Sequence, residues 1–207
     1  PTKEIVKAFD VSLILYAEHS FNVSTFTART ITSSLSDIHG AITGAIASLK
    51  GPLHGGANEE VMHMMNKIKT PEKALKWINN ALDKKEVVMG FGHRVYKKGD
   101  SRVPTMEKYF RKVSNAKHDK KFVKIYDIVK NVMIEKKNIH PNVDYPTGPT
   151  YHLMGFDTDF FTPIFVISRI TGWSAHVMEQ HTANKLIRPL SKYTGSDHRK
   201  VLLLSQR

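Results

Sequence analysis

The chain has 207 residues, of which 41% are hydrophobic and 24% are charged. This composition is ordinary for a globular protein and excludes an intrinsically disordered one. No apolar run reaches the roughly 18 residues of a membrane helix, which excludes a membrane-spanning protein. The absence of cysteine excludes disulfides, thiolate metal sites and a cysteine nucleophile. No basic-then-apolar leader opens the sequence, so we expect a cytoplasmic protein.

The net charge is +12, and it is distributed unevenly. Segment 108–137 holds ten Lys or Arg residues and three acids, a net +7. Such an excess favours an anionic partner, which could be nucleic acid, an acidic membrane face or a phosphorylated cofactor. A solvated lysine-rich helix face explains the same pattern without a partner.

Apolar residues recur at helical spacing through most of the chain, so we expect an all-α fold. In chain order, the predicted helices are 3–29, 36–50, 57–68, 71–82, a short one after Pro104, 122–133, 159–171 and 173–187. Residues 87–89 come nearest to a strand, and this run is short. Gly40 and Gly44 lie four residues apart on one predicted helix. Because glycine costs helix stability, we expect a second helix to pack very close there, within the chain or across a subunit interface.

Three segments between the predicted helices are rich in Gly, Pro, His or Asn, namely 51–58, 89–104 and 138–149. Functional groups concentrate on loops held by a rigid scaffold. His54 and His93 each lie among glycines, which let backbone approach a ligand closely. Asp144 is the carboxylate of the third loop, and a turn residue or helix N-cap is its simpler role.

Common catalytic motifs are absent. The sequence has no P-loop, no H-E-x-x-H and no G-x-S-x-G. The spacing of His176 and His181 is poor for a shared metal, and we expect no metal site. Arginine matches a carboxylate with its planar fork, which makes three arginines candidates for carboxylate binding: Arg102, Arg169 and Arg188.

Together, these loops resemble the citrate synthase family. GFGHRVYKKGDSR (90–102) fits the family signature, and GPLHGGANEEV (51–61) and PNVDYPTG (141–148) resemble its other two catalytic loops. HSFNVSTFTAR (19–29) and SRITGWSAHVMEQ (168–180) also look like family segments. The likeness extends to about Asp197 and covers the C-terminal part of a family chain. We therefore expect a truncated chain, with an atypical tail at 201–204.

The resemblance implies a fold with a large and a small helical domain. The small domain would span 55–149, and residues 1–54 and 150–207 would belong to the large domain. The 36–50 helix would lie at the interface of a homodimer.

The resemblance also implies an acyltransferase that condenses acetyl-CoA with oxaloacetate and hydrolyses citryl-CoA, the first step of the tricarboxylic acid cycle. Asp144 would be the base, His54 would bind the thioester oxygen, and His93 would polarise the ketone. His19, Arg102 and Arg169 would hold oxaloacetate, and Arg188 would reach the partner subunit's site. CoA would be a co-substrate, with no permanently bound cofactor and no metal. Its expected contacts are Glu86, Val87, Val88, Met89, Gly90, Lys136, Lys137 and Asn142.

Three alternatives stay open at this point. A 2-methylcitrate synthase would use propionyl-CoA with the same catalytic residues, because one extra methylene is worth only about 1–3 kcal/mol in a pocket. A basic nucleic-acid-binding protein would explain the charge and leave the three loops unexplained. An inactive fragment, serving only folding or assembly, is compatible with the family, and we expect the isolated chain to be inactive. Within the main hypothesis, neither nucleic acid nor membrane is a partner.

Overall fold

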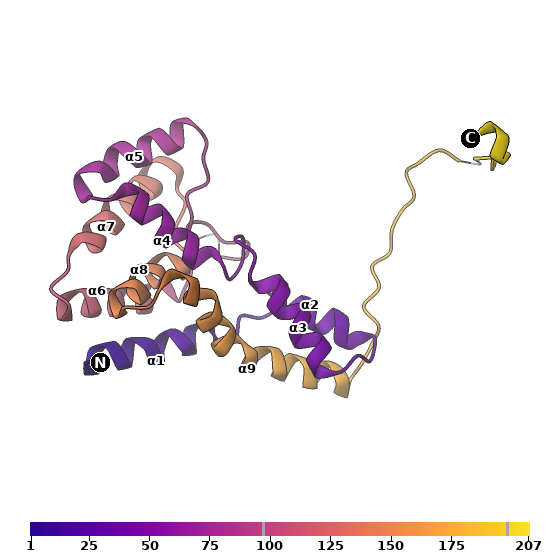
Figure 1. Ribbon diagram of the computed structural model, residues 1–207, viewed down its shortest axis with the longest axis horizontal. Coiled ribbons are helices and arrows are strands. Elements are labelled where there is room, and N and C mark those ends of the chain that lie inside the picture. The colour runs from indigo at the N-terminus through magenta and orange to yellow at the C-terminus, as the bar shows by residue number, and fades with distance from the viewer. Residues whose placement is uncertain (97, 198) are drawn as a thin grey trace.

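The computed structural model describes residues 1–96, 98–197 and 199–207, and these residues form helices without a strand (Figure 1). The all-α prediction is therefore confirmed. The described helices are α1 (Lys3–Ala17), α2 (Val23–Ser33), α3 (Ile38–Leu49), α4 (Ala57–Ile68), α5 (Pro71–Asp83), α6 (Val103–Ala116), α7 (Lys121–Lys137), α8 (Asp144–Met154) and α9 (Phe161–Thr182), with short 3₁₀ turns at Thr158–Phe160 and Leu204–Gln206. None of the helices in these ranges is long and apolar enough to cross a membrane.

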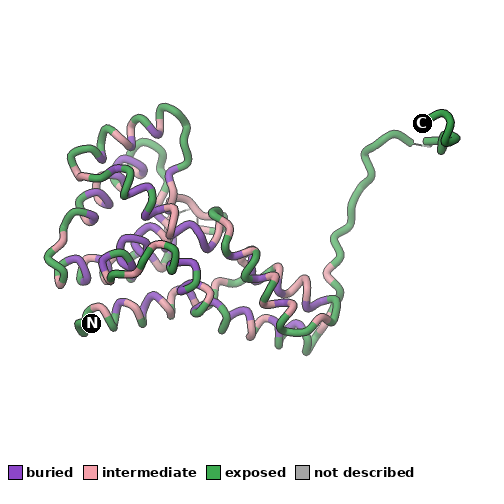
Figure 2. Tube along the Cα trace, in the orientation of Figure 1, coloured by how far each residue is buried: buried purple, intermediate pink, exposed green. Residues whose placement is uncertain are grey.

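Helices α4 to α8 gather into one group, and α1 packs along α6 and α9 (Figure 1). Helices α2 and α3 pack on each other and on the second half of α9. Beyond α9 the chain is extended and leads away from the helices, and Figure 2 shows this segment as exposed. The division into domains at 54/55 and 149/150 stays a prediction.

The expected single helix over 3–29 is wrong, because the chain is non-helical between α1 and α2. Asn22 caps α2, and its Oδ1 accepts a hydrogen bond from the Thr25 backbone N–H at 3.1 Å. An N-cap side chain satisfies one of the backbone donors that a helix start leaves open. The break leaves His19 in the short link between the two helices.

The two helices expected on either side of Gly172 form one continuous helix, α9, which ends at Thr182 rather than at 187. Glycine at this position reflects close packing rather than a helix end. A Cβ atom on Gly172 would overlap the Ala17 carbonyl oxygen of α1. The residue lets two helices approach each other, which is a packing reason for a glycine inside a helix.

The third predicted loop is also partly helical, since α8 begins at Asp144 and continues through Pro149. Pro146 lies in the first turn, where a missing N–H breaks no hydrogen bond of the helix. Most residues of α8 are buried, so tertiary packing offsets the cost of Pro149 inside the helix.

The close helix packing predicted for Gly44 is confirmed, and its neighbour belongs to the same chain. A Cβ atom on Gly44 would overlap the side chain of Ile31 on α2. The nearest atoms to such a Cβ on Gly40 come from Ser36 and Asp37. Gly44 therefore serves the α2–α3 pair within the chain, whereas Gly40 makes no close approach to a second helix.

Candidate active site

A cavity of about 1010 Å³ lies where the end of α1, the start of α2, residues 52–57, residues 87–96 and the start of α8 meet α9. It brings together six residues predicted to act on substrate, which are His19, His54, His93, Arg102, Asp144 and Arg169. Five predicted CoA contacts also line it, namely Val87, Val88, Met89, Gly90 and Asn142. Segments far apart in sequence thus supply one concave site.

Four predicted residues do not line this cavity: Glu86, Lys136, Lys137 and Arg188. Lys136 Nζ instead donates to Asn79 Oδ1 at 2.8 Å. Arg188 lies on the extended segment after α9, where its guanidinium bonds the neighbouring Pro189 carbonyl. Arg188 therefore does not line the cavity of its own chain.

Asp144 contributes a carboxylate to the cavity from the first position of α8. Tyr16 on α1 is fully buried and donates a hydrogen bond from its Oη to Asp144 Oδ1 at 2.6 Å. Burial raises the pKa of Asp144 to about 6, although the Tyr16 hydrogen bond and the charge of Arg102 act in the opposite direction. A carboxylate with this pKa is ionised at neutral pH and is a stronger base than an exposed one.

Asn142 fixes the position of Asp144 by joining two loops. Its Oδ1 accepts from the Asp144 backbone N–H at 3.1 Å, and its Nδ2 donates to the Gly92 carbonyl at 3.0 Å. Its backbone N–H donates to the Gly90 carbonyl at 2.9 Å. The oxygen and the nitrogen of the Asn142 amide therefore each hydrogen-bond a backbone group next to the site.

His54 lines the cavity as a neutral ring with one N–H donor. Its Nε2 accepts from the Ser24 backbone N–H at 3.3 Å and lies 2.8 Å from Ser24 Oγ. The proton of neutral His54 must then lie on Nδ1. Burial and the charge of Arg169 lower the pKa of His54 to about 4. Trp173 Nε1 donates to the same Ser24 hydroxyl at 3.1 Å, which anchors the arrangement on α9.

His93 is oriented by backbone in the same way. The N–H groups of Val95 and Tyr96 donate to its Nδ1 at 3.1 and 3.2 Å, so the proton of the neutral ring lies on Nε2. His93 Nε2 lies 3.2 Å from His19 Nε2, which accepts when His93 donates. Burial, followed by the charge of Arg102, lowers the pKa of His19 to about 4.

Two arginines, Arg102 half-buried and Arg169 buried, make the cavity suitable for an anion. Arg102 donates to Asp100 from Nε at 3.0 Å and from Nη2 at 2.8 Å. Arg169 is 1% exposed and donates from Nε to the Tyr16 carbonyl at 2.6 Å. Its Nη1 is buried without a hydrogen-bond partner, and such a donor is costly unless a ligand satisfies it. Burial and then Arg102 lower the pKa of Arg169 to about 10, which a bound carboxylate would reverse.

Three residues of this arrangement were not predicted from the sequence: Tyr16, Ser24 and Asp100. Tyr16 and Ser24 lie within apolar or small-residue helical patterns that indicate only packing. Asp100 lies inside the predicted signature loop, where its position beside Arg102 was the available signal. Asp100 also accepts from the Val143 backbone N–H at 3.0 Å. No cluster of His, Asp or Glu that could hold a metal occurs in residues 1–96, 98–197 and 199–207.

The chain is similar in sequence to known proteins. The family described as "Citrate synthase, C-terminal domain" matches residues 1–190. The chain is 62% identical over 203 residues to 2-methylcitrate synthase 2 of Corynebacterium glutamicum, covering 98% of the chain and 53% of that protein. It is 54% identical over 202 residues to a citrate synthase of Mycolicibacterium smegmatis, covering 98% of the chain and 54% of that protein.

The fold agrees with a solved structure. The chain superposes on citrate synthase from Thermoplasma acidophilum, described as a ternary complex with carboxymethyl coenzyme A and oxaloacetate, with a TM-score of 0.90 and 38% identity. The match covers 100% of this chain and 56% of that one. The chain thus spans about half the length of the relatives it matches.

Proposed function

The chain belongs to the citrate synthase family, and we propose that it carries the catalytic residues for condensing a short acyl-CoA with oxaloacetate. The observation that carries this proposal is the pairing of a half-buried base, whose pKa is raised, with a neutral donor. Asp144 has a pKa of about 6, and it lines the same cavity as neutral His54, whose proton lies on Nδ1 because Nε2 accepts from Ser24. A carbon acid as weak as a thioester loses its α-proton only when the developing enolate oxygen is stabilised at the same time.

In the first step, Asp144 takes a proton from the α-carbon of the thioester. The electron pair of that C–H bond forms the enol carbon–carbon bond, and the carbonyl oxygen gains the negative charge. The N–H of His54 donates to this oxygen. A neutral imidazole suits the role because it donates a hydrogen bond to the developing oxyanion and its ring has no net charge at rest.

In the second step, the enol carbon attacks the ketone carbon of oxaloacetate. His93, with its proton on Nε2, donates to the ketone oxygen and stabilises the alkoxide. Arg102, Arg169 and His19 bind the two carboxylates, and the unpaired Nη1 of Arg169 gains its missing partner. Water then hydrolyses the thioester product and releases CoA.

The CoA side of the cavity is the backbone from Val87 to Gly90, which lines it beside the site residues. Glu86, Lys136 and Lys137 lie beyond the lining and would contact more distant parts of CoA. We also propose that residues 55–149 form a small domain. The protein would be a homodimer in which Arg188 enters the partner's site. The exposed extended segment that carries Arg188 is free to reach another subunit.

Two acyl donors fit this chemistry. Propionyl-CoA is favoured by the 62% identical relative named 2-methylcitrate synthase. Acetyl-CoA, which would place the enzyme at the entry of the tricarboxylic acid cycle, is supported by the 54% identical relative named citrate synthase. The two donors differ by one methylene, and the catalytic residues are the same for both.

The test uses a chimaera that joins residues 1–207 to the N-terminal half of the C. glutamicum relative. Its kcat/KM is measured for acetyl-CoA and propionyl-CoA with oxaloacetate, and CoA release is followed. We expect turnover of both, with propionyl-CoA preferred. A folded chimaera that turns over neither donor would contradict the proposal, and a preference for acetyl-CoA would reverse the choice between donors.

A further inference from the structure

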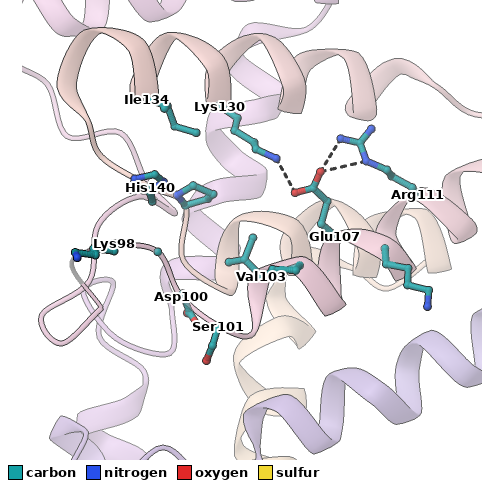
Figure 3. Close-up of a pocket in the computed structure, with 13 residues that line it drawn as sticks. Lys98, Asp100, Ser101, Val103, Glu107, Arg111, Lys130, Ile134 and His140 are labelled. Atoms are coloured by element: carbon teal, nitrogen blue, oxygen red, sulfur yellow. Dashed lines mark hydrogen bonds and ion pairs between the residues drawn. The ribbon is translucent and has the colours of Figure 1, made fainter.

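Two clusters of charged side chains have no role in the reaction proposed above. The first consists of Glu107, Arg111 and Lys130, in which Glu107 forms ion pairs with both partners (Figure 3). These three residues line a separate cavity of about 650 Å³, and the pair with Lys130 joins α6 to α7. The second cluster lies next to His19, a residue of the large cavity, and it is therefore the one that bears on the site.

The second cluster is centred on His176 of α9. His176 Nδ1 lies 3.0 Å from Arg29 Nη1, and His176 Nε2 lies 3.0 Å from Glu18 Oε1. Because a guanidinium can only donate, Nδ1 must accept, so the ring proton lies on Nε2 and is donated to Glu18. Arg29 also forms an ion pair with Glu179 of α9. The hydrogen bonds therefore run in one direction, from Arg29 through His176 to Glu18.

This cluster holds the chain on both sides of His19. Glu18, which precedes it, is bound by His176. Phe21 follows two positions later, and its ring centroid lies 5.0 Å from Arg29 Cζ and 5.7 Å from the centroid of the His176 ring. The short link between α1 and α2 is thus fixed before and after His19 by the same two side chains.

Two further residues on the same face of α9 contact the end of α1. Arg169 Nε donates to the Tyr16 carbonyl at 2.6 Å, and Gly172 makes room for the Ala17 carbonyl. Arg169, Gly172 and His176 are spaced i, i+3 and i+7, which places them on one side of a helix. This side of α9 therefore contacts the last residues of α1 in order, and His176 makes the contact nearest to the link.

His19 needs such support because it lies between two helices rather than within one. Its ring lines the large cavity, and its Nε2 lies 3.2 Å from His93 Nε2. A misplacement of about 1 Å is enough to impair a binding or catalytic group. The position of His19 therefore depends on what anchors the link.

We propose that His176 is a positioning residue, which acts through Glu18 and the α1–α2 link to hold His19 where it binds a carboxylate of oxaloacetate. His176 does not line the large cavity, so it acts without contact with the substrate. The inference rests on the proposed function, because oxaloacetate is the ligand assigned there to His19.

The experiment compares two substitutions of His176 in the chimaera. The amide nitrogen of His176→Gln reaches the place of imidazole Nε2 and can donate to Glu18, whereas the shorter side chain of His176→Asn does not. We expect His176→Asn to raise the Kd and the KM of oxaloacetate by about tenfold, the effect of one lost charge-assisted contact. The kcat should stay within about threefold, since uniform binding is lost. His176→Gln should restore the Kd and the KM to within about threefold of the parent.

A double-mutant cycle tests whether the effect passes through Glu18. In a Glu18→Ala background the contact is already absent, so His176→Asn should change the oxaloacetate Kd by less than about twofold. A full tenfold effect in that background would contradict the proposed path. His181→Asn, at an exposed position near the end of the same helix, is the matched control and should leave the Kd and the KM unchanged.

The ring signals of His19 make the test independent of catalysis. They are observed by NMR in the chimaera labelled at histidine Cε1, and circular dichroism confirms that each variant folds. We expect the His19 signals to move in His176→Asn, to return in His176→Gln and to stay in place in His181→Asn. If His176→Asn does not fold, Glu18→Ala takes its place in this comparison.

A folded parent chimaera that neither binds oxaloacetate nor turns over would contradict the proposed function alone, and the His19 signals would still decide the positioning role. Unmoved His19 signals in His176→Asn would overturn the inference. A decrease in kcat with an unchanged oxaloacetate KM, or a failure of His176→Gln to restore binding, would overturn it as well.

Discussion

Tyr16 and Asp144 are separated by 128 positions in the sequence and joined by a hydrogen bond of 2.6 Å. Burial, followed by the negative charge of Asp144, raises the pKa of Tyr16 well above its usual value, so the phenol remains a donor at every pH of interest. The ring of Tyr16 is stacked on Phe165 of α9 at 3.8 Å between centroids. The packing of α1 against α9 therefore holds the Tyr16 ring in place, and its hydroxyl in turn holds the proposed base.

The first prediction follows from this hydrogen bond. Tyr16→Phe removes an interaction that lowers the pKa of Asp144, so the pKa should rise above about 6. Because the base must be ionised to act, the acid limb of kcat/KM should move to higher pH in the chimaera. The pH profile of kcat/KM, measured from pH 5 to 9, checks this. Tyr109→Phe on α6 is the matched control, and an unchanged limb in Tyr16→Phe would contradict the role.

The second prediction concerns Asp144→Asn, which keeps the shape and the hydrogen bond from Tyr16 but removes basicity. We expect kcat to fall by about 10²–10⁴-fold, the usual contribution of a general base, with oxaloacetate binding retained. Isothermal titration with oxaloacetate and a turnover assay separate the two effects. Exposed Asp157→Asn is the control, and near-normal turnover in Asp144→Asn would exclude this residue as the base.

The third prediction is the effect of the same substitution on stability. The pKa of Asp144 is about 6 in the folded chain and 3.8 as the reference for an unfolded one, so the folded chain binds this proton more tightly. The contribution of Asp144 to the free energy of unfolding therefore decreases as pH rises from about 4 to about 6 and is constant above that.

Asp144→Asn should accordingly be more stable than the parent at pH 7, by about 1–3 kcal/mol, and the difference should disappear near pH 4. Urea denaturation of the 207-residue chain at both pH values measures it. A destabilised variant at pH 7 would show that the ionised carboxylate is satisfied by its neighbours rather than strained by burial.

The fourth prediction concerns Ser24, which accepts from Trp173 Nε1 and contacts His54 Nε2. Ser24→Ala leaves the buried Trp173 N–H without an acceptor, which costs about 1–3 kcal/mol. It also removes one of the two groups that orient His54, so kcat should decrease more than oxaloacetate affinity. Denaturation and turnover measurements check the two effects. Ser174→Ala, a half-buried serine on α9, should change neither property.

The fifth prediction concerns the isolated chain. Large apolar side chains are exposed on α1, α2, α3 and α9, among them Ile14, Phe26, Ile46, Ile167 and Met178. Exposed apolar surface favours association, so we expect the purified 207-residue chain to self-associate and to be inactive or nearly so. Light scattering beside a CoA-release assay tests both. A clean monomer would contradict the first half, and full activity the second.

Much of the architecture followed from local patterns. The period of apolar residues predicted the positions of α3, α4, α5 and α7 because each helix buries one face, and a buried face leaves its period in the sequence. The glycine- and histidine-rich segments, with their resemblance to the family, also identified His54, His93 and Asp144 before the structure placed them in one cavity. These features are local in the chain, so sequence alone carries them.

Other features were decided by contacts between distant residues. Gly172 looked like a helix boundary, but its missing side chain makes room for the Ala17 carbonyl of α1. The prolines of α8 indicated a loop, but burial on most sides makes the segment helical. No sequence motif singles out Tyr16, and only the approach of α1 to α8 brings its hydroxyl to Asp144. A sequence records the period of each element, whereas pKa values, tautomers and close approaches depend on which elements the fold brings together.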